Sequence, residues 1–153
     1  MIYYRNATRG SGVDARRLKA TARALLQEVG EAGSSLSLSL VGDREIQTLN
    51  RAHRAQDRAT DVLSFPMGVG ARRPDRTGEP ERLLGDVVIS VETARRQAAA
   101  YDAGLQDEVN RLLIHGLLHV MGHDHAEREE RDLMESEERR LAAAIGMAWP
   151  YDR

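Results

Sequence analysis

Histidines are concentrated in one short segment of this chain. Four of the five lie in the segment His115-Gly-Leu-Leu-His119-Val-Met-Gly-His123-Asp124-His125. Imidazole is the commonest protein ligand for metal ions such as zinc, and a catalytic zinc site keeps three protein ligands with a fourth position open. The segment therefore indicates a three-histidine metal site, with zinc preferred over nickel, copper or iron, in a chain that has no cysteine.

His115 and His119 are spaced as neighbours on one face of a helix. Residues four apart on a helix place their Cβ atoms roughly 6 Å from each other, so two imidazoles can reach one ion at about 2.0–2.1 Å. The surrounding residues support a helix, because apolar side chains recur at helical spacing from Val109 to Val120. Asp107 is expected to cap its N-terminus.

The third ligand has to come from beyond the end of this helix. His123 follows His115 by roughly 12 Å along a continuous helix, which is too far for both to bind one ion. Gly122 can take the left-handed conformation that ends helices and turns the chain back. His125 is then the better third ligand, and His123 is expected to point elsewhere. Asp124 could orient a ligand imidazole through a hydrogen bond or serve as a base.

The spacing of these histidines also matches a class of zinc peptidases, the metzincins, whose pattern is H-E-x-x-H-x-x-G-x-x-H. Those enzymes use the glutamate after the first histidine as general base, and Gly116 occupies that position here. The glycine therefore argues against a metallopeptidase. A residue this small either leaves room for a bulky nucleotide near the ion or permits close packing of the helix.

Three sequence blocks resemble those of the YbeY family, bacterial endoribonucleases that are also called rRNA maturation factors. The histidine segment has the form H-G-x-L-H-x-x-G-x-D-H. Residues 50–66 resemble the family pattern N-x-x-Y-R-x-x-D-x-P-T-D-V-L-S-F-P, and residues 84–90 resemble L-G-D-I-V-I-S. Three blocks in the same order make the match specific, although His53, Ala59 and His123 stand where the family pattern has Tyr, Pro and Tyr.

The resemblance implies a zinc-dependent endoribonuclease that is specific for single-stranded RNA. It implies a role in 16S rRNA 3′ end maturation and in ribosome quality control, with a ribosomal RNA precursor as substrate and the small ribosomal subunit as partner. By resemblance, the zinc ligands are His115, His119 and His125, and Arg54 is the functional arginine. A guanidinium suits the negative charge that develops on a phosphodiester in the transition state.

The general base is not assigned by the resemblance. Asp124, His123 and a substrate 2′-hydroxyl are the candidates. Because no base is assigned, a ribosome-assembly factor with a structural zinc is the main alternative to an enzyme, and a metallopeptidase is the weaker one.

Composition describes an ordinary soluble protein. The chain has 153 residues, of which 41% are hydrophobic and 30% charged, and this predicts one domain over residues 1–153. The net charge of −2 gives no support for nucleic-acid binding, although arginines gather in residues 1–25 and 51–82 and acids in residues 127–138. We expect a cytoplasmic protein without a membrane span, because cysteine and an apolar leader are absent and no apolar run approaches the roughly 20 residues a span needs. The oligomeric state is not indicated.

Periodicity and capping residues predict the elements around these side chains. The Leu-Ser alternation of residues 35–41 is typical of a strand with one buried face, and Asp14 and Ser90 are expected to cap helices. Residues 68–82, which are rich in Gly, Pro and Arg, are expected to form a long exposed loop. The expected strands are 2–5, 35–41, 60–65 and 83–89, and the expected helices are 14–31, one from 43, 90–103, one through the first two histidines, and 127–145. This order predicts an α/β (α+β) fold with a mixed sheet of about four strands packed with about five helices.

Overall fold

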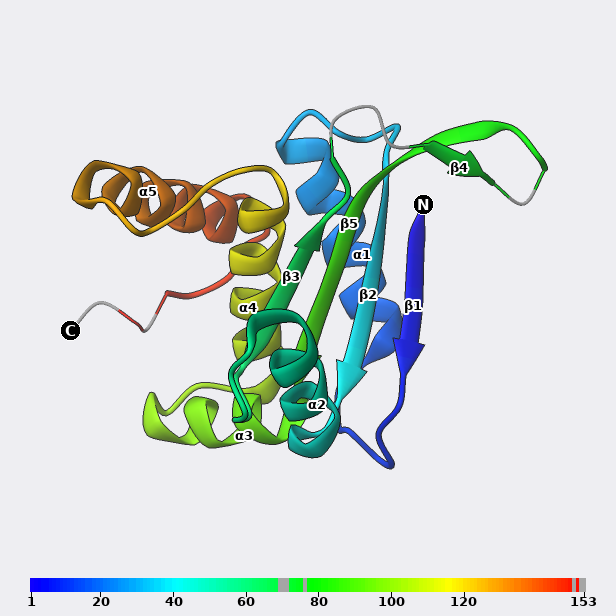
Figure 1. The fold of residues 1–153 in the computed structure, drawn as a ribbon. Helices are drawn as coiled ribbons and strands as arrows, with labels where there is room; N and C mark the ends of the chain where they lie inside the picture. The colour runs from blue at the N-terminus through cyan, green and yellow to red at the C-terminus, as the bar shows by residue number, and fades with distance from the viewer. Residues whose placement is uncertain (69–71, 76, 150, 152–153) are drawn as a thin grey trace.

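A mixed β-sheet lies at the centre of the protein (Figure 1), as described by a computed structural model for residues 1–68, 72–75, 77–149 and 151. Its strands lie in the order β1 (Ile2–Asn6), β2 (Ser35–Val41), β5 (Pro80–Ser90) and β3 (Val62–Pro66). The first three are parallel, and β3 is antiparallel to β5. The predicted mixed sheet of about four strands is therefore confirmed.

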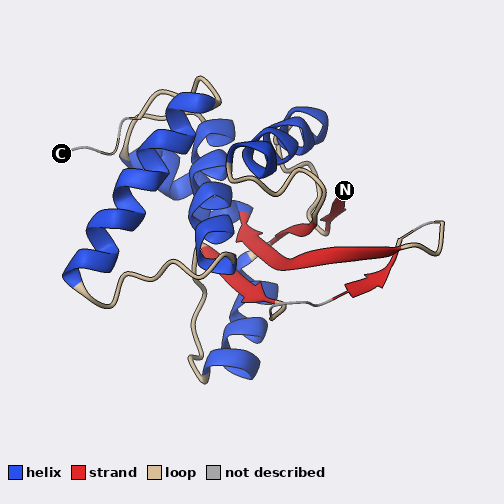
Figure 2. Cartoon of the chain, turned by 90° about the horizontal axis from the view of Figure 1, so that it is seen from above, coloured by secondary structure: helices blue, strands red, loops and turns tan. Residues whose placement is uncertain are grey.

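The described part of the chain has five helices. They are α1 (Ala15–Glu28), α2 (Asp43–Arg54), α3 (Val91–Ala100), α4 (Leu105–Val120) and α5 (Arg128–Ala144). Within these described residues, α5 packs on α4 and not on the sheet itself. Helix α2 covers one face through a small cluster that includes Ile46, Leu63 and Val88. The main core joins the opposite face to α1, α3, α4 and α5, so that the sheet lies between α2 and the other helices (Figure 2). The predicted α/β fold with about five helices is confirmed.

Helix α4, which carries the first two histidines, is buried along most of its length. It packs against β3 and β5, and Leu113, Ile114 and Leu117 are fully buried. Gly116 faces the sheet in this contact, because a Cβ atom there would lie 2.6 Å from Cγ1 of Val87. The structure thus favours close packing as the role of this glycine.

The start of α4 differs from the prediction. The helix begins at Leu105, after an extended Gly104, so the expectation that Asp107 caps it is wrong. Asp107 instead lies in the first turn, where a negative charge interacts favourably with the helix dipole. A glycine cap has no side chain for the sequence pattern to detect.

The caps predicted for α1 and α3 are confirmed. The Asp14 carboxylate accepts a hydrogen bond from the backbone N–H of Arg17 at 3.1 Å. The Ser90 hydroxyl accepts one from the backbone N–H of Thr93 at 3.3 Å. Within the described ranges, every helix is too short or too polar to span a lipid bilayer.

The expected long loop before β5 is partly a β-hairpin. Strand β4 (Arg72–Pro74) pairs antiparallel with the beginning of β5, from Arg82 to Pro80. The Asp75 carboxylate holds the turn by accepting hydrogen bonds from the backbone N–H groups of Thr77 at 2.8 Å and Glu79 at 3.0 Å. The loop prediction is therefore wrong for these residues, because the turn is stabilised locally and needs no apolar alternation. Residues 69–71 and 76 of the expected loop lie outside the described residues.

Candidate metal centre

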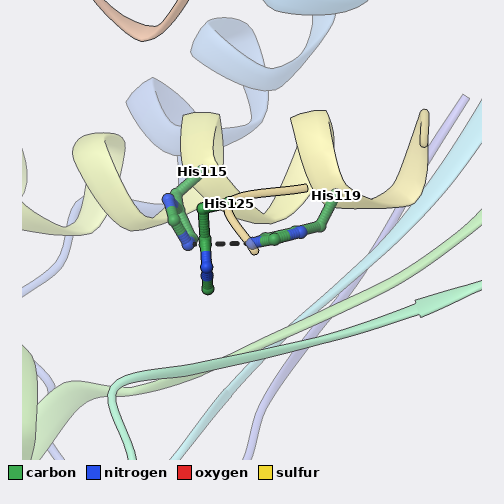
Figure 3. Close-up of side chains that lie close together, drawn as sticks. All are labelled: His115, His119 and His125. Atoms are coloured by element: carbon green, nitrogen blue, oxygen red, sulfur yellow. Dashed lines mark hydrogen bonds between the residues drawn. The ribbon is translucent and has the colours of Figure 1, made fainter. Parts of the chain in front are cut away.

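Three imidazole rings converge at the end of α4 (Figure 3). Each of His115, His119 and His125 offers one nitrogen, and the three nitrogens lie within 4.8 Å of one another. The Nε2 atoms of His115 and His119 are 3.1 Å apart. The structure thus brings together the three side chains that the sequence singled out, and their donor atoms can face a single ion.

The turn after α4 brings His125 back to the helix. Gly122 has a φ of 100°, in the left-handed region. The backbone N–H of His123 donates to the carbonyl of Leu118 at 2.9 Å and that of Gly122 to the carbonyl of His119 at 3.0 Å, which is the pattern of a glycine-terminated helix. His123 is not part of the three-histidine group, because the turn directs the chain past it before His125.

Each of the two helical imidazoles has an acceptor oxygen beside its Nδ1 atom, at hydrogen-bond distance for His119 only. Nδ1 of His119 lies 2.9 Å from the carbonyl oxygen of His123, and Nδ1 of His115 lies 3.6 Å from Oε2 of Glu138. A proton held at each Nδ1 leaves the Nε2 lone pair available to a metal. Glu138 is buried, so the position of its carboxylate is defined by the packing of α5 on α4.

The electrostatic environment keeps one of these ligands in the form that a metal requires. Burial lowers the pKa of His119, and the neighbouring imidazole of His115 lowers it further. A neutral imidazole is the state that binds zinc. Three nitrogen donors that meet beside an open cavity fit a zinc site with one free coordination position.

A cavity of about 480 Å³ adjoins the three histidines and contains the other residues that were predicted to act. Arg54 lines it from the end of α2, with Nη2 donating to the Ser64 carbonyl at 3.2 Å. Asp124 also lines it, and its Oδ1 accepts a hydrogen bond from the backbone N–H of His125 at 2.7 Å. Arg54 is therefore near the candidate metal site, as expected, and Asp124 supports the segment that carries His125.

The sequence patterns did not identify Arg111, which precedes His115 by one helical turn. Its Nη2 lies 2.6 Å from Oε1 of the fully buried Glu108 and 4.0 Å from Oδ2 of Asp61. Burial alone would lower the pKa of Arg111, but its hydrogen bonds with Glu108 raise it. The regular spacing of Arg111, His115 and His119 was an available signal, since all three lie on one face of α4. No spacing in the sequence could have indicated Glu138, because only tertiary packing brings α5 to the site.

Comparison with known proteins agrees with this geometry. A family profile described as "Endoribonuclease YbeY" matches residues 3–146. The chain belongs to the YbeY family. The family resemblance expected from the three sequence blocks is thus confirmed.

Individual YbeY relatives cover most of the chain. A protein from Myxococcus xanthus named Endoribonuclease YbeY is 50% identical over 139 residues, which are 90% of this chain and 46% of that protein. One from Anaeromyxobacter is 45% identical over 133 residues, 87% of this chain and 66% of the relative. One from Carboxydothermus hydrogenoformans is 43% identical over 122 residues, 80% of this chain and 79% of the relative. The chain thus spans about half to two thirds of the length of the first two relatives.

A solution structure of a Thermotoga maritima protein has a similar fold. It matches with a TM-score of 0.58 and 23% sequence identity, covering 100% of both chains. At this identity the likeness shows the fold alone.

Proposed function

We propose that this chain is a zinc-dependent endoribonuclease that cleaves single-stranded RNA, with precursor ribosomal RNA as its substrate. The proposed role is maturation of the 3′ end of 16S rRNA and ribosome quality control on the small subunit, in the cytoplasm. The observation that supports it is the presence of three histidine nitrogens and the Arg54 guanidinium at one cavity of a YbeY-family chain. The relatives' name, endoribonuclease, agrees with this chemistry.

The proposed metal ligands are His115 and His119, through Nε2, and His125. Zinc bound by them would supply Lewis acidity, for lowering the pKa of a water molecule or polarising a phosphoryl oxygen. The carbonyl of His123 orients the His119 ring through a hydrogen bond, and the carboxylate of Glu138 lies 3.6 Å from Nδ1 of His115, where it favours a proton on that nitrogen.

Arg54 is the proposed contact for the scissile phosphodiester. A guanidinium binds phosphate oxygens in a fixed fork, and this contact strengthens as negative charge develops in the transition state. The hydrogen bond to the Ser64 carbonyl fixes one end of the guanidinium beside the cavity. Arg54 itself is exposed, so its remaining N–H groups are open to a substrate phosphate.

Asp124 is the proposed proton acceptor. It is exposed and lines the same cavity as the histidines, so a water molecule or a 2′-hydroxyl can reach its carboxylate. His123 lines the cavity as well and is the second candidate. Asp124 and His123 can be distinguished by substituting each one and measuring the cleavage rate as a function of pH. Only loss of the true base should remove the fall in cleavage rate at low pH.

The position of Gly116 supports a nuclease over a peptidase. Metzincin peptidases need a glutamate directly after the first histidine. Here that position faces Val87 and Ser64 of the sheet, at 2.6 Å and 3.1 Å from an added Cβ. A glutamate at this position would collide with the sheet.

The test is cleavage of an end-labelled single-stranded RNA by the purified, zinc-loaded protein. We expect cleavage that is lost on chelation, returns with zinc and is absent in His119→Ala, with a duplex of the same sequence left intact. Arg54→Ala should retain its zinc and fold yet cleave about 10²–10³-fold more slowly. Equal cleavage by all samples would reveal a contaminant. Absence of cleavage together with binding to small ribosomal subunits would replace the enzyme by an assembly factor.

A further inference from the structure

A second cavity, of about 670 Å³, adjoins the candidate metal centre. His115 lines both this cavity and the one that contains Arg54, so the two spaces meet at one residue of the candidate metal centre. The walls of the second cavity come from α4, α5 and two aromatic residues that follow α5. They include Arg111, Glu135, Trp149 and Tyr151. None of these four residues has a role in the proposed chemistry.

An aromatic cluster forms one wall of this second cavity. The rings of Trp149 and Tyr151 meet edge to face with centroids 5.1 Å apart, and Tyr151 meets Tyr101 in the same way at 4.8 Å. The Arg111 guanidinium lies 4.8 Å from the centroid of the Tyr151 ring. Trp149 is half buried and packs against the main core. Trp149 and Tyr151 thus lie beside the metal centre, and Trp149 places an indole ring at the cavity.

The charges around the cavity suit a neutral group better than a phosphate. Arg111 is paired with the buried carboxylate of Glu108 at 2.6 Å, which largely neutralises its charge. Glu135, Glu138 and Arg139 also line the space. With Glu108 included, three carboxylates face two guanidinium groups, and this balance disfavours an anion. Carboxylates do accept hydrogen bonds from ring N–H and amino groups, which are the donors on the edges of nucleobases.

From these contacts we infer that the second cavity binds the nucleobase beside the phosphodiester held at Arg54, with Trp149 as the stacking surface. This inference rests on the proposed RNA substrate. Aromatic side chains bind unpaired bases by stacking, which tolerates different sequences and requires a single strand. A duplex keeps its bases stacked on each other, so the cavity would contribute to the preference for single strands.

Trp149 is the only tryptophan of the chain, so its fluorescence reports on this cavity directly. The probe is a short single-stranded 2′-O-methyl RNA, which binds the zinc-loaded protein without offering a 2′-hydroxyl. Stacking of a base on the indole should quench the fluorescence to saturation. A matched oligonucleotide in which every base is replaced by an abasic sugar keeps the phosphates and should leave the fluorescence unchanged.

Variants of Trp149 test the energetic contribution of the stacking. Trp149→Ala should bind the labelled oligonucleotide about ten-fold more weakly, whereas Trp149→Phe should stay within about three-fold of the wild type. Both should retain zinc stoichiometry and bind the abasic oligonucleotide as the wild type does. Far-UV circular dichroism checks the fold of each variant, and the wild-type fluorescence titration needs no variant at all.

The outcomes separate this inference from the proposed function. RNA cleavage without quenching, or equal quenching by the abasic oligonucleotide, overturns the base-binding cavity and leaves the nuclease in place. Quenching with base-dependent affinity but without RNA cleavage supports the cavity and overturns the nuclease.

Discussion

Replacing Gly116 by alanine tests the contact that holds the metal-binding helix against the sheet. The added Cβ would lie 2.6 Å from Cγ1 of Val87, whereas carbon atoms attract best at about 3.5–4.0 Å. Helix and strand must therefore separate by about 1 Å. Val87 is fully buried, β-branched and in a strand with neighbours on both sides, so it cannot rotate away.

The expected loss of stability follows from two opposing terms. Overpacking of a stiff core contact costs about 2–3 kcal/mol, the upper part of its usual range. Alanine is favoured over glycine inside a helix by about 1 kcal/mol. We therefore expect Gly116→Ala to lower the free energy of unfolding by about 1–2 kcal/mol, which lowers the melting temperature by about 2–8 °C in a chain of this length.

The assay is reversible urea unfolding followed by circular dichroism, with a chelator present so that metal binding does not contribute. Gly33→Ala is the matched control, because no heavy atom lies within 4 Å of an added Cβ there and the change should be within about 0.5 kcal/mol. A Gly116→Ala protein as stable as the wild type, or more stable, would refute the packing argument.

Three further substitutions test residues that stabilise the fold or position the metal ligands. Burial alone would raise the pKa of Asp43, but hydrogen bonds from two hydroxyls and an arginine hold it below its usual 3.8. The wild type should therefore be more stable than Asp43→Asn, with the full difference present above pH 3.8. The difference should disappear as the pH falls through the lower pKa of the folded state, and thermal melts across a pH series measure this. Glu138→Ala should weaken zinc binding about 10–100-fold in competition with a chromophoric chelator, whereas Glu137→Ala, which loses only a surface pair, should not. An alanine at position 122 would meet no steric contact but would have to adopt a φ of 100°. Gly122→Ala should therefore lower the free energy of unfolding in urea by about 1–2 kcal/mol and weaken zinc binding. Unchanged stability would contradict the argument from backbone strain.

Local patterns in the sequence predicted the parts of the fold that are formed locally. The alternation of residues 35–41 corresponds to β2, where Leu36, Leu38 and Leu40 are fully buried under the helices. The hairpin before β5 was missed because its turn depends on the hydrogen bonds of the Asp75 carboxylate. A Gly- and Pro-rich composition hides such a turn from any search for hydrophobic periodicity.

For the site too, the sequence predicted the parts that are formed locally and missed the parts that depend on tertiary packing. The helix pitch and the turn at Gly122 sufficed to predict that three imidazoles meet, because these features are set within eleven consecutive residues of the chain. Arg54 came from the family pattern, since periodicity carries no information on how α2 lies relative to α4. Glu138 and the docking of Trp149 depend on how α5 packs, and no local pattern reports that.

The backbone constrains the three histidines to different degrees, and this affects how an ion would enter and leave the site. His115 and His119 are on a helix whose backbone amides are protected by the core, whereas His125 is exposed on the segment between α4 and α5. Segments of this kind open locally, far more often than the whole chain unfolds. We expect ion exchange to begin with release of His125, while the helical pair keeps its place. Zinc could then be taken up and lost on the timescale of a short loop, without unfolding of the protein.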